Sequence, residues 1–399
     1  MNPTERLYTP KFFQVLLSTA LTMVGVSMQY HFGEFVAYRG YSEATLGWVT
    51  GIAALGSLLL RPYAGSWIDR VGCRASLLGS GLCGAAANFL FQFTDSLTAI
   101  CLLRIIMVAS NATFLATVAV FAARIAPFPR RAESLGSIGI GGFLGMMTGP
   151  LIGDLIFAHA RDLPQAFRFF FTAVAAANLL AAIVVINLQA PDLHPSPGGP
   201  GFFRLIRQHW PGSILLVATI FTAALTIHMS FLERYAHFRG FEDIRWFFLV
   251  YAPTAITLRL LCRRFPERFG RPRVCIAGLT GMAIGMVCFI FVRQQWHLVL
   301  PALLMGAGHA FVFPSMVDLA ADALPTEHRG MGTSIVLGAG DVGILFGGIA
   351  WGQLIERAGW EPTFILIAVL MWFAAGLYTW RHRAAAVSPA GKPAHSALP

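Results

Sequence analysis

The sequence predicts an all-α membrane protein in which twelve transmembrane helices form two pseudo-symmetric six-helix halves. Three observations support this prediction: an apolar composition, twelve apolar segments, and a repeat that relates the two halves of the chain. Of the 399 residues, 56% are hydrophobic and only 12% are charged, whereas soluble domains carry about 25% charged residues. Because a membrane-spanning helix needs about 20 mostly apolar residues, the chain has room for roughly a dozen.

The apolar segments are separated by short polar stretches. They lie near residues 11–32, 44–66, 75–93, 97–123, 134–158, 166–188, 211–232, 244–262, 274–292, 297–321, 331–355 and 361–380. The longest polar interruption follows the sixth segment, where prolines and glycines disfavour a helix. The predicted organisation is an N-terminal half at 1–188, a linker at 189–210, a C-terminal half at 211–381 and a tail at 382–399.

The second half of the chain repeats features of the first at an almost constant interval. The stretch "ERFGRPR" from Glu267 follows "DRVGCR" from Asp69 by 198 residues, and Arg259 follows Arg61 by the same interval. "GQLI" from residue 352 echoes "GDLI" from residue 153. Such echoes indicate a tandem duplication of a six-helix unit. The two units are parallel in the membrane because six is an even number.

The charge distribution predicts how the chain sits in the membrane. The net charge is +10, but the arginines form short clusters between apolar segments, which excludes the continuous basic face of a nucleic-acid-binding protein. Short cytoplasmic loops carry an excess of Lys and Arg, and here most loop Lys and Arg residues lie on the side of the termini. We therefore expect a multi-pass protein of a bacterial-type cytoplasmic (inner) membrane, with both termini cytoplasmic.

No cofactor or metal is expected from the sequence pattern. The six cysteines lie in or beside apolar segments without metal-ligand spacing, and no phosphate-binding loop of the G-x-x-x-x-G-K-[ST] kind is present, so ATP-driven transport is not supported. The first apolar run continues for about 20 residues without a cleavage site, which is too long for a signal peptide. We therefore expect this run to form the first membrane helix and not to be cleaved.

The stretch "YAGSWIDRVGCRAS" (63–76) places charges between the second and third apolar segments. It resembles the G-x-x-x-D-R-x-G-[RK]-[RK] signature of the major facilitator superfamily, and the resemblance extends over the whole chain through the twelve helices, the linker and the doubled loop. In that family the motif acts as a latch for the outward-facing state. The latch residues that the resemblance implies are Gly65, Asp69, Arg70, Gly72 and Arg74, with Glu267, Arg268 and Gly270 in the second copy.

Physical roles can be assigned to the residues of the first copy. We expect Gly65 to permit close helix approach, Gly72 to allow a tight turn, and Asp69 to accept hydrogen bonds at the N-terminal end of a neighbouring helix. Arg70 and Arg74 would bridge to the opposing half. Cys73 stands where the family commonly has a basic residue. The alternative is a solvated turn whose arginines only satisfy the positive-inside rule.

The fifth apolar segment contains "GMMTGPLIGD". With Gly145, Gly149, Pro150 and Gly153 it resembles the G-x-x-x-G-P-x-x-G-G antiporter motif of the same family, ending here in Asp154 instead of glycine. In the family this motif marks exporters. The alternative is ordinary packing of small residues between membrane helices.

Ionisable groups inside membrane segments are candidates for function, because an ionised group at the bilayer centre costs about 2.5–3.5 kcal/mol. Asp341, near the middle of the eleventh segment, is a candidate for proton coupling or substrate binding, or alternatively a structural partner of an arginine or of backbone groups. Arg104 matches the arginine of the family's R-x-x-x-G-x-G motif, which is implicated in proton handling, but the glycines are missing. Alternatively, Arg104 snorkels toward the membrane surface or hydrogen-bonds carbonyls of the first segment. The further proton-coupling or substrate candidates are Glu34, Glu233, His309 and Asn111.

These further candidates have alternatives of their own. Glu34 and Glu233 end the first and seventh segments, where they line the mouth of a cavity or act as interface anchors. His309 matches the polar stretch around Asn111 at an interval of about 199 residues, so it either lines a central cavity or hydrogen-bonds a neighbouring helix. The pair Asp318 and Asp322 is expected to meet the arginines that follow the eighth segment.

The resemblance implies a secondary active transporter that exports a small organic molecule, such as a drug, metabolite or siderophore, in exchange for protons. The alternative is proton-coupled uptake of a small organic acid or other nutrient. A polytopic membrane enzyme or receptor is a distant alternative, because no convergent cluster of ionisable residues is visible in the sequence. The expected partners are the substrate, protons and the lipid bilayer, and the expected functional unit is a monomer.

Overall fold

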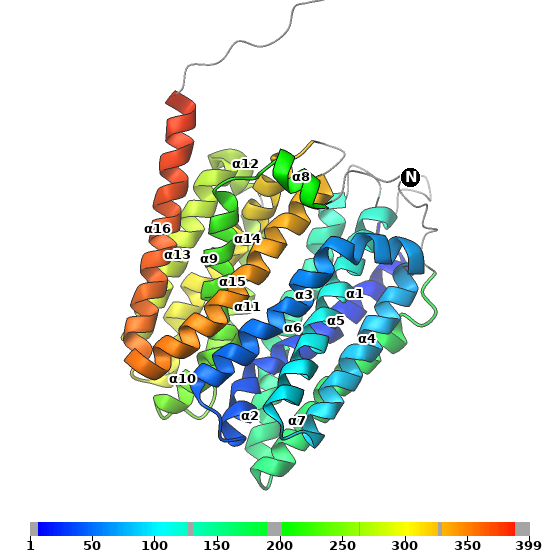
Figure 1. Ribbon diagram of the computed structural model, residues 1–399, viewed down its shortest axis with the longest axis vertical. Helices are drawn as coiled ribbons and strands as arrows, with labels where there is room; N and C mark the ends of the chain where they lie inside the picture. Colours follow the sequence, from blue (N-terminus) through cyan, green and yellow to red (C-terminus); the bar gives the residue numbers. More distant parts are fainter. Residues whose placement is uncertain (1–6, 127–130, 190–201, 263, 326–328, 388–399) are drawn as a thin grey trace, which may run out of the picture.

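The computed structural model describes residues 7–126, 131–189, 202–262, 264–325 and 329–387, and these residues form helices and loops without a β-strand (Figure 1). The long helices of the first half are α1 (Pro10–Met28), α3 (Glu43–Val71), α4 (Cys73–Leu90), α5 (Leu97–Ile125), α6 (Arg131–His159) and α7 (Leu163–Val184). Those of the second half are α9 (Ile214–Thr226), α11 (Arg245–Leu261), α13 (Arg271–Ile290), α14 (Val299–Asp322), α15 (Arg329–Ala358) and α16 (Trp360–Val387).

Short elements extend or connect the long helices. In the first half they are η2 (Gln29–His31), α2 (Phe32–Tyr38) and η3 (Phe91–Phe93). In the second half they are α8 (Phe202–Gln208), η5 (Ile227–Phe231), α10 (Leu232–Phe238), α12 (Phe265–Phe269) and η6 (Gln295–Leu298). Through η2 and η5, α1 continues into α2 and α9 continues into α10. The first and seventh membrane helices therefore each contain an irregular turn at equivalent positions of the repeat.

The predicted fold of twelve membrane helices in two halves is confirmed. Among the described residues, eleven helical spans are long and apolar enough to cross a membrane. The twelfth is α11, whose 17 residues still rise about 26 Å at 1.5 Å per residue. The predicted linker and tail lie partly outside the described residues, and α16 extends to Val387, several residues into the predicted tail.

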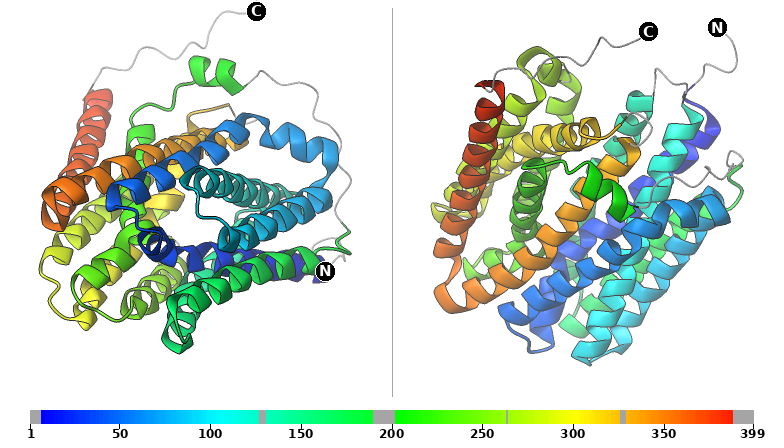
Figure 2. Two further views of the ribbon diagram at one scale, coloured as in Figure 1. Left: turned by 60° about the horizontal axis from the view of Figure 1, so that its bottom comes forward. Right: turned by 45° about the horizontal axis from the view of Figure 1, so that its top comes forward.

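The molecule has two distinct ends. Helix α1 begins and α16 ends at one end, which also carries α8 and α12 (Figure 1), and we call this the termini end. Helices α2 and α10 lie at the opposite end, which we call the far end. Figure 2 shows in its right-hand view that the long helices run between these two ends.

Local sequence explains where several helices begin. Ser42 and Asp162 precede α3 and α7, and their side-chain oxygens accept hydrogen bonds from the backbone N–H groups of Thr45 (3.4 Å) and Gln165 (2.8 Å). Such caps satisfy N–H groups that have no partner within the helix. Each cap lies in a far-end loop, so it fixes the point at which the chain turns back into the bundle.

Helices α3 and α15 join the two halves and lie side by side (Figure 2, left). Their far-end portions meet through glycines on both helices. A Cβ atom added at Gly51 would lie 2.5 Å from the backbone oxygen of Leu345, and one added at Gly352 would lie 2.5 Å from the backbone oxygen of Glu43. Small residues let membrane helices approach to backbone contact, so this glycine interface holds the halves together at the far end.

Candidate functional site

Asp341 is paired with an arginine of the other half. The Nη2 atom of Arg61 on α3 donates to Oδ1 of Asp341 on α15 over 2.9 Å, and Nε of Arg61 donates to Oδ2. The Asp341 side chain is only 6% exposed, and that of Arg61 is 19% exposed. A fork of two charge-assisted hydrogen bonds is among the stronger polar interactions in proteins. The pair therefore links α3, the second membrane helix of the first half, to α15, the fifth membrane helix of the second half.

A second buried cluster forms around His31. Its Nδ1 atom lies 3.1 Å from Oε2 of Glu233, and its Nε2 atom lies 3.6 Å from Oδ1 of Asp154 and 3.1 Å from the backbone oxygen of Pro150. All three ionisable side chains are at least nine-tenths buried. His31 and Asp154 belong to the first half and Glu233 to the second, so this cluster also bridges the halves.

Irregular backbone and the glycine motif together position the His31 cluster. His31 closes the 3-10 turn η2, and Glu233 follows the π-helical turn η5; π-helical turns are frequent at functional sites. On α6, a Cβ atom at Gly149 or Gly153 would collide with Ser27 or His31. The antiporter-like motif thus packs α6 closely on α1, as its small residues predict, and this packing carries Asp154 to His31.

Among the residues that the structure describes, the His31 cluster is the one group whose side chains could hold a metal ion. One ligand atom from each of His31, Asp154 and Glu233 lies within 4.8 Å of the others, and one imidazole with two carboxylates suits a zinc- or manganese-like ion. The members of this donor set come from three separate segments, so no local sequence pattern indicates it. Short-range spacing, on which the expectation of no metal rested, cannot detect such a group.

At the far end, Arg234 of α10 reaches across to the first half. Its Nε atom donates to Glu43 over 2.7 Å and its Nη1 atom donates to Glu34 over 3.3 Å, while His237 lies 3.7 Å from Glu34. The backbone N–H of Ala44 donates to Glu356 over 2.9 Å, again between halves. These contacts close the two halves against each other at this end.

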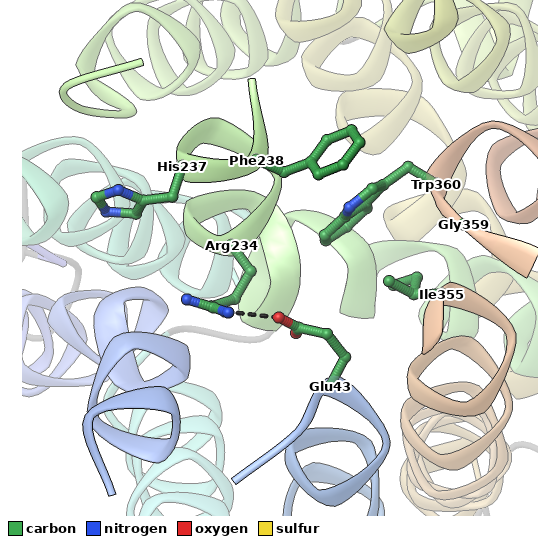
Figure 3. Close-up of a pocket in the computed structure, with 7 residues that line it drawn as sticks. All are labelled: Glu43, Arg234, His237, Phe238, Ile355, Gly359 and Trp360. Carbon is green, nitrogen blue, oxygen red and sulfur yellow. Dashed lines mark hydrogen bonds and ion pairs between the residues drawn. The ribbon is translucent and has the colours of Figure 1, made fainter. Parts of the chain in front are cut away.

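A pocket lies among these far-end contacts (Figure 3). It has a volume of about 470 Å³ and is lined by Glu43, Arg234, His237, Phe238, Ile355, Gly359 and Trp360. Figure 3 shows the Glu43–Arg234 hydrogen bond inside it. Glu34 and Glu233, predicted to lie at the mouth of a cavity, therefore stand beside a closed contact between the halves.

Arg104 belongs to a different network, inside the first half. Its Nη1 atom donates to Oε1 of Gln29 over 2.7 Å, and Nε2 of Gln29 donates to Oδ1 of Asn88 over 2.5 Å. The guanidinium carbon lies 4.1 Å from the ring centroid of Phe32. Arg104 is buried and has no carboxylate partner among the described residues. A neutral amide and an aromatic face therefore hold its charge, and neither comes from the other half.

His309 and Asn111 are not brought together by a hydrogen bond. Nδ1 of His309 is hydrogen-bonded to the hydroxyl of Tyr251, and the imidazole packs against the rings of Phe143 and Phe221 at 5.5 Å. Asn111 is half-buried, and its side chain makes no hydrogen bond to another residue that the structure describes. His309 therefore lies in an aromatic environment that reaches Phe143 of the other half.

The glycines of the loop motif differ in their environments. Gly72 and Gly270 have φ angles of +88° and +89° at the starts of α4 and α13, a conformation that favours glycine. The tight turn expected at Gly72 is present, and the repeat reproduces it. At Gly65 no atom lies within 4 Å of an added Cβ. The close helix approach expected there is absent in this conformation, because the neighbouring helix lies too far away.

Of the charged residues in the first loop, Asp69 pairs within its own half. Oδ1 of Asp69 accepts a hydrogen bond over 2.9 Å from Arg124 at the end of α5. Arg70 and Arg74 are exposed, and neither forms an ion pair with another described residue. The bridge to the opposing half that we expected from these arginines is therefore not seen among the described residues. The start of α15 borders residues 326–328, which lie outside them.

The second loop copy uses a different pairing. Glu267 and Arg268 are exposed and form no ion pair with a described residue. Arg271 instead pairs with Asp322, and its Nε atom lies 3.7 Å from Asp318. This confirms that the two acids at the end of α14 meet the arginines of this loop. The second copy thus ties α13 to α14 within its own half.

Sequence reasoning missed Arg61, Arg234 and Arg259 as members of the site. Arg61 and Arg259 were visible as an equivalent pair in the repeat, but their partners lie on distant segments. Arg259 of α11 places its guanidinium carbon 4.6 Å from the ring centroid of Phe143. A systematic comparison of equivalent positions in the two halves is the signal that could have found it.

Two six-helix halves that meet through glycine contacts and buried ion pairs form the architecture of a membrane transporter whose halves rock against each other. Comparison with known sequences supports this class. The sequence model of the Major Facilitator Superfamily matches residues 12–265 and 242–398. The chain therefore belongs to the major facilitator superfamily.

Named relatives come from several bacteria. The chain is 25% identical over 353 residues to the uncharacterized MFS-type transporter YhhS of Escherichia coli strain K12, covering 86% of this chain and 84% of that protein. It is 22% identical over 368 residues to the staphylopine export protein of Staphylococcus aureus strain Mu50, covering 88% and 91%. The crystal structure of the D323A mutant of the nucleoside transporter NupG superposes with a TM-score of 0.80 at 14% identity, covering 93% and 99% of the two chains, which supports the fold alone.

Proposed function

We propose that this transporter exports a small organic molecule, such as a drug, metabolite or siderophore, in exchange for protons. In this proposal it works as a monomer in the bacterial inner membrane with both termini cytoplasmic. The far end then faces outward, and the contacts of Arg234, His31 and the glycine interface close the outward side. The loop motif of residues 63–76 would act during the transition that opens it.

The observation that carries proton coupling is the buried pair of Arg61 and Asp341 between the halves. A proton that binds Asp341 neutralises the carboxylate and removes its attraction for Arg61, and loss of the proton restores it. Protonation is thereby linked to how strongly α3 and α15 attract each other. The pair thus supplies a direct physical route from proton binding to the movement of one half against the other.

Other polar groups are proposed to act with Asp341. Glu233 bridges the halves through His31, and Glu34 does so through Arg234. Arg104 stands in a buried network of the first half, while His309 and Asn111 are proposed contacts of the substrate. The proposed latch consists of the two loop copies, in which Asp69 with Arg124 and Arg271 with Asp322 tie neighbouring helices.

Export is favoured over uptake by two observations. The antiporter-like motif on α6 packs on α1 and carries Asp154 to a cluster shared by both halves. The staphylopine export protein, similar to this chain over most of its length, is named for export. Direction and substrate are tested together by metabolite profiles of cells that lack or overproduce the protein. Export predicts that a compound accumulates inside cells lacking it; depletion inside those cells would favour uptake.

The coupling residue is tested with Asp341→Asn in proteoliposomes, using the compound found by the metabolite profiles. Asparagine retains the shape and most hydrogen bonds but does not titrate. The variant should exchange substrate down its gradient and fail to concentrate it when a pH gradient is imposed. Asp95→Asn, at an 80% exposed aspartate, is the matched control and should concentrate normally. If Asp341→Asn retains full pH-driven accumulation, the proton site lies instead at Glu34, Glu233 or Asp154.

A further inference from the structure

Arg259 is a membrane arginine that has no counter-ion among the residues that the structure describes. Its guanidinium carbon lies 4.6 Å from the ring centroid of Phe143 on α6 and 5.8 Å from that of Phe313 on α14. Its Nε atom is buried without a hydrogen-bond partner, and no carboxylate of the described residues forms an ion pair with it. Two aromatic faces, one from each half, are therefore what stabilises this positive charge.

Comparison of the two repeats shows that Arg259 lacks, among the described residues, the carboxylate partner that its counterpart Arg61 has. Arg259 follows Arg61 by 198 residues, and the residue that precedes Asp341 by the same interval is Phe143. In the repeat, α11 corresponds to α3 and α6 corresponds to α15. The contact between α11 and α6 is therefore the counterpart of the contact between α3 and α15. Arg61 meets a carboxylate where Arg259 meets the ring of Phe143. The arginine is present in both repeats, but the acid is present in only one.

A cation–π contact offsets only part of the cost of an unpaired membrane charge. Such contacts are worth about 0.5–2 kcal/mol, and unpaired ionisable groups in membrane helices commonly mark substrate or ion pathways. The neighbours of Arg259 add polarity without a negative charge. Tyr251, about two turns earlier on α11, is hydrogen-bonded to His309, whose imidazole lies 5.9 Å from the ring of Phe313.

We propose that Arg259 binds the anionic group of a flat organic anion, with Phe143 and Phe313 contacting its ring and the Tyr251–His309 pair adjoining it. The ligand supplies the negative charge that Asp341 supplies to Arg61. Because Phe143 and Arg259 belong to different halves, the ligand is held between the parts that move during transport. This inference specifies the substrate class of the proposed transporter, and for that role it rests on the proposed function.

Binding is tested on the purified full-length protein with two fluorescent probes that share a xanthene ring system. Fluorescein is an anion, and rhodamine 6G is a cation. Fluorescence anisotropy should show saturable binding of fluorescein and weaker binding of rhodamine 6G. Arg259→Gln should weaken fluorescein binding roughly 10–100-fold, the effect of losing one charge-assisted hydrogen bond. Arg293→Gln, at an exposed arginine of the same half, is the matched control and should bind normally.

A second substitution tests the repeat argument directly. Phe143→Asp places a carboxylate at the position equivalent to Asp341, so it should pair with Arg259 and abolish fluorescein binding. Phe143→Leu removes the ring without adding charge and should weaken binding only a few-fold. Arg259→Lys retains the positive charge and should retain binding better than Arg259→Gln. Size-exclusion profiles of the detergent-solubilised variants check that each one is folded.

Three results would overturn the inference. They are failure of the wild-type protein to bind fluorescein, equal binding by folded Arg259→Gln, and equal or tighter binding of rhodamine 6G. The wild-type measurement decides the matter even where a variant does not fold. A protein that binds fluorescein through Arg259 but moves nothing across proteoliposome membranes would refute the proposed transport function and leave this binding site intact.

Discussion

Replacement of Arg234 by glutamine should open the far end of the molecule. Arg234 donates to Glu43 over 2.7 Å and to Glu34 over 3.3 Å, so Arg234→Gln leaves two carboxylates of the first half without their shared counter-ion. The variant should therefore shift the equilibrium between the closed and open far end toward the open form. His237 remains near Glu34 and compensates only in its protonated form.

The size of the shift follows from the exposure of the pair. The side chain of Arg234 is 27% exposed and those of its partners are 19% exposed, so the interaction is intermediate between surface pairs, worth up to about 1 kcal/mol, and buried pairs, whose disruption costs about 3–5 kcal/mol. We expect a loss of about 1–3 kcal/mol from the closed form, which corresponds to a roughly 5–150-fold change in the open-to-closed ratio.

Distances between spin labels measure this change. Labels at Phe93→Cys and Trp296→Cys, both exposed in far-end loops of opposite halves, report the separation of the halves by double electron–electron resonance in a protein without its six native cysteines. Arg234→Gln should add a population at longer distance. The matched control is Arg39→Gln, because Arg39 pairs with Asp95 inside the first half. An unchanged distance distribution in Arg234→Gln would refute the view that these ion pairs hold the far end closed.

Three further outcomes are expected. Gly51→Val should prevent far-end closure and abolish transport because its side chain would collide with the backbone of α15, whereas Gly79→Val, where no atom lies within 4 Å of an added Cβ, should be tolerated; transport by Gly51→Val at wild-type rate would contradict this. Asp69→Asn should leave the protein inserted but slow transport, by up to about fivefold for a partly exposed pair with Arg124; an unaltered rate at equal protein level would leave the loop with a topological role only. A cysteine at residue 199, outside the described residues, should resist membrane-impermeant reagents in intact cells, and ready labelling there would place the linker outside.

Equivalent positions in the two halves carry information that single motifs do not. The loop motif was recognisable from Asp69 and its neighbours, yet its arginines make no described contact with the other half. Two arginines that do pair across the halves, Arg61 and Arg234, stand outside both recognised motifs. A sequence motif consists of residues close together along the chain, whereas contacts between halves depend on residues far apart in sequence.

The sequence by itself determined the number of helices, their approximate limits, the duplication and the family. These features depend on local composition and on a fixed interval along the chain, because a membrane requires apolar helices of about 20 residues whatever their neighbours are. It also identified Asp341 as a costly group inside the membrane. It left open whether that carboxylate had an arginine partner.

Only the tertiary structure decided the partners of the charged groups. It paired Asp341 with Arg61, gathered His31, Asp154 and Glu233 from three helices, and left Arg259 against Phe143. Side chains separated by more than a hundred residues meet only after the helices have packed, and their approach depends on glycine contacts and irregular turns that no local pattern encodes. The electrostatics of the site are therefore a property of the packed halves and not of any one segment.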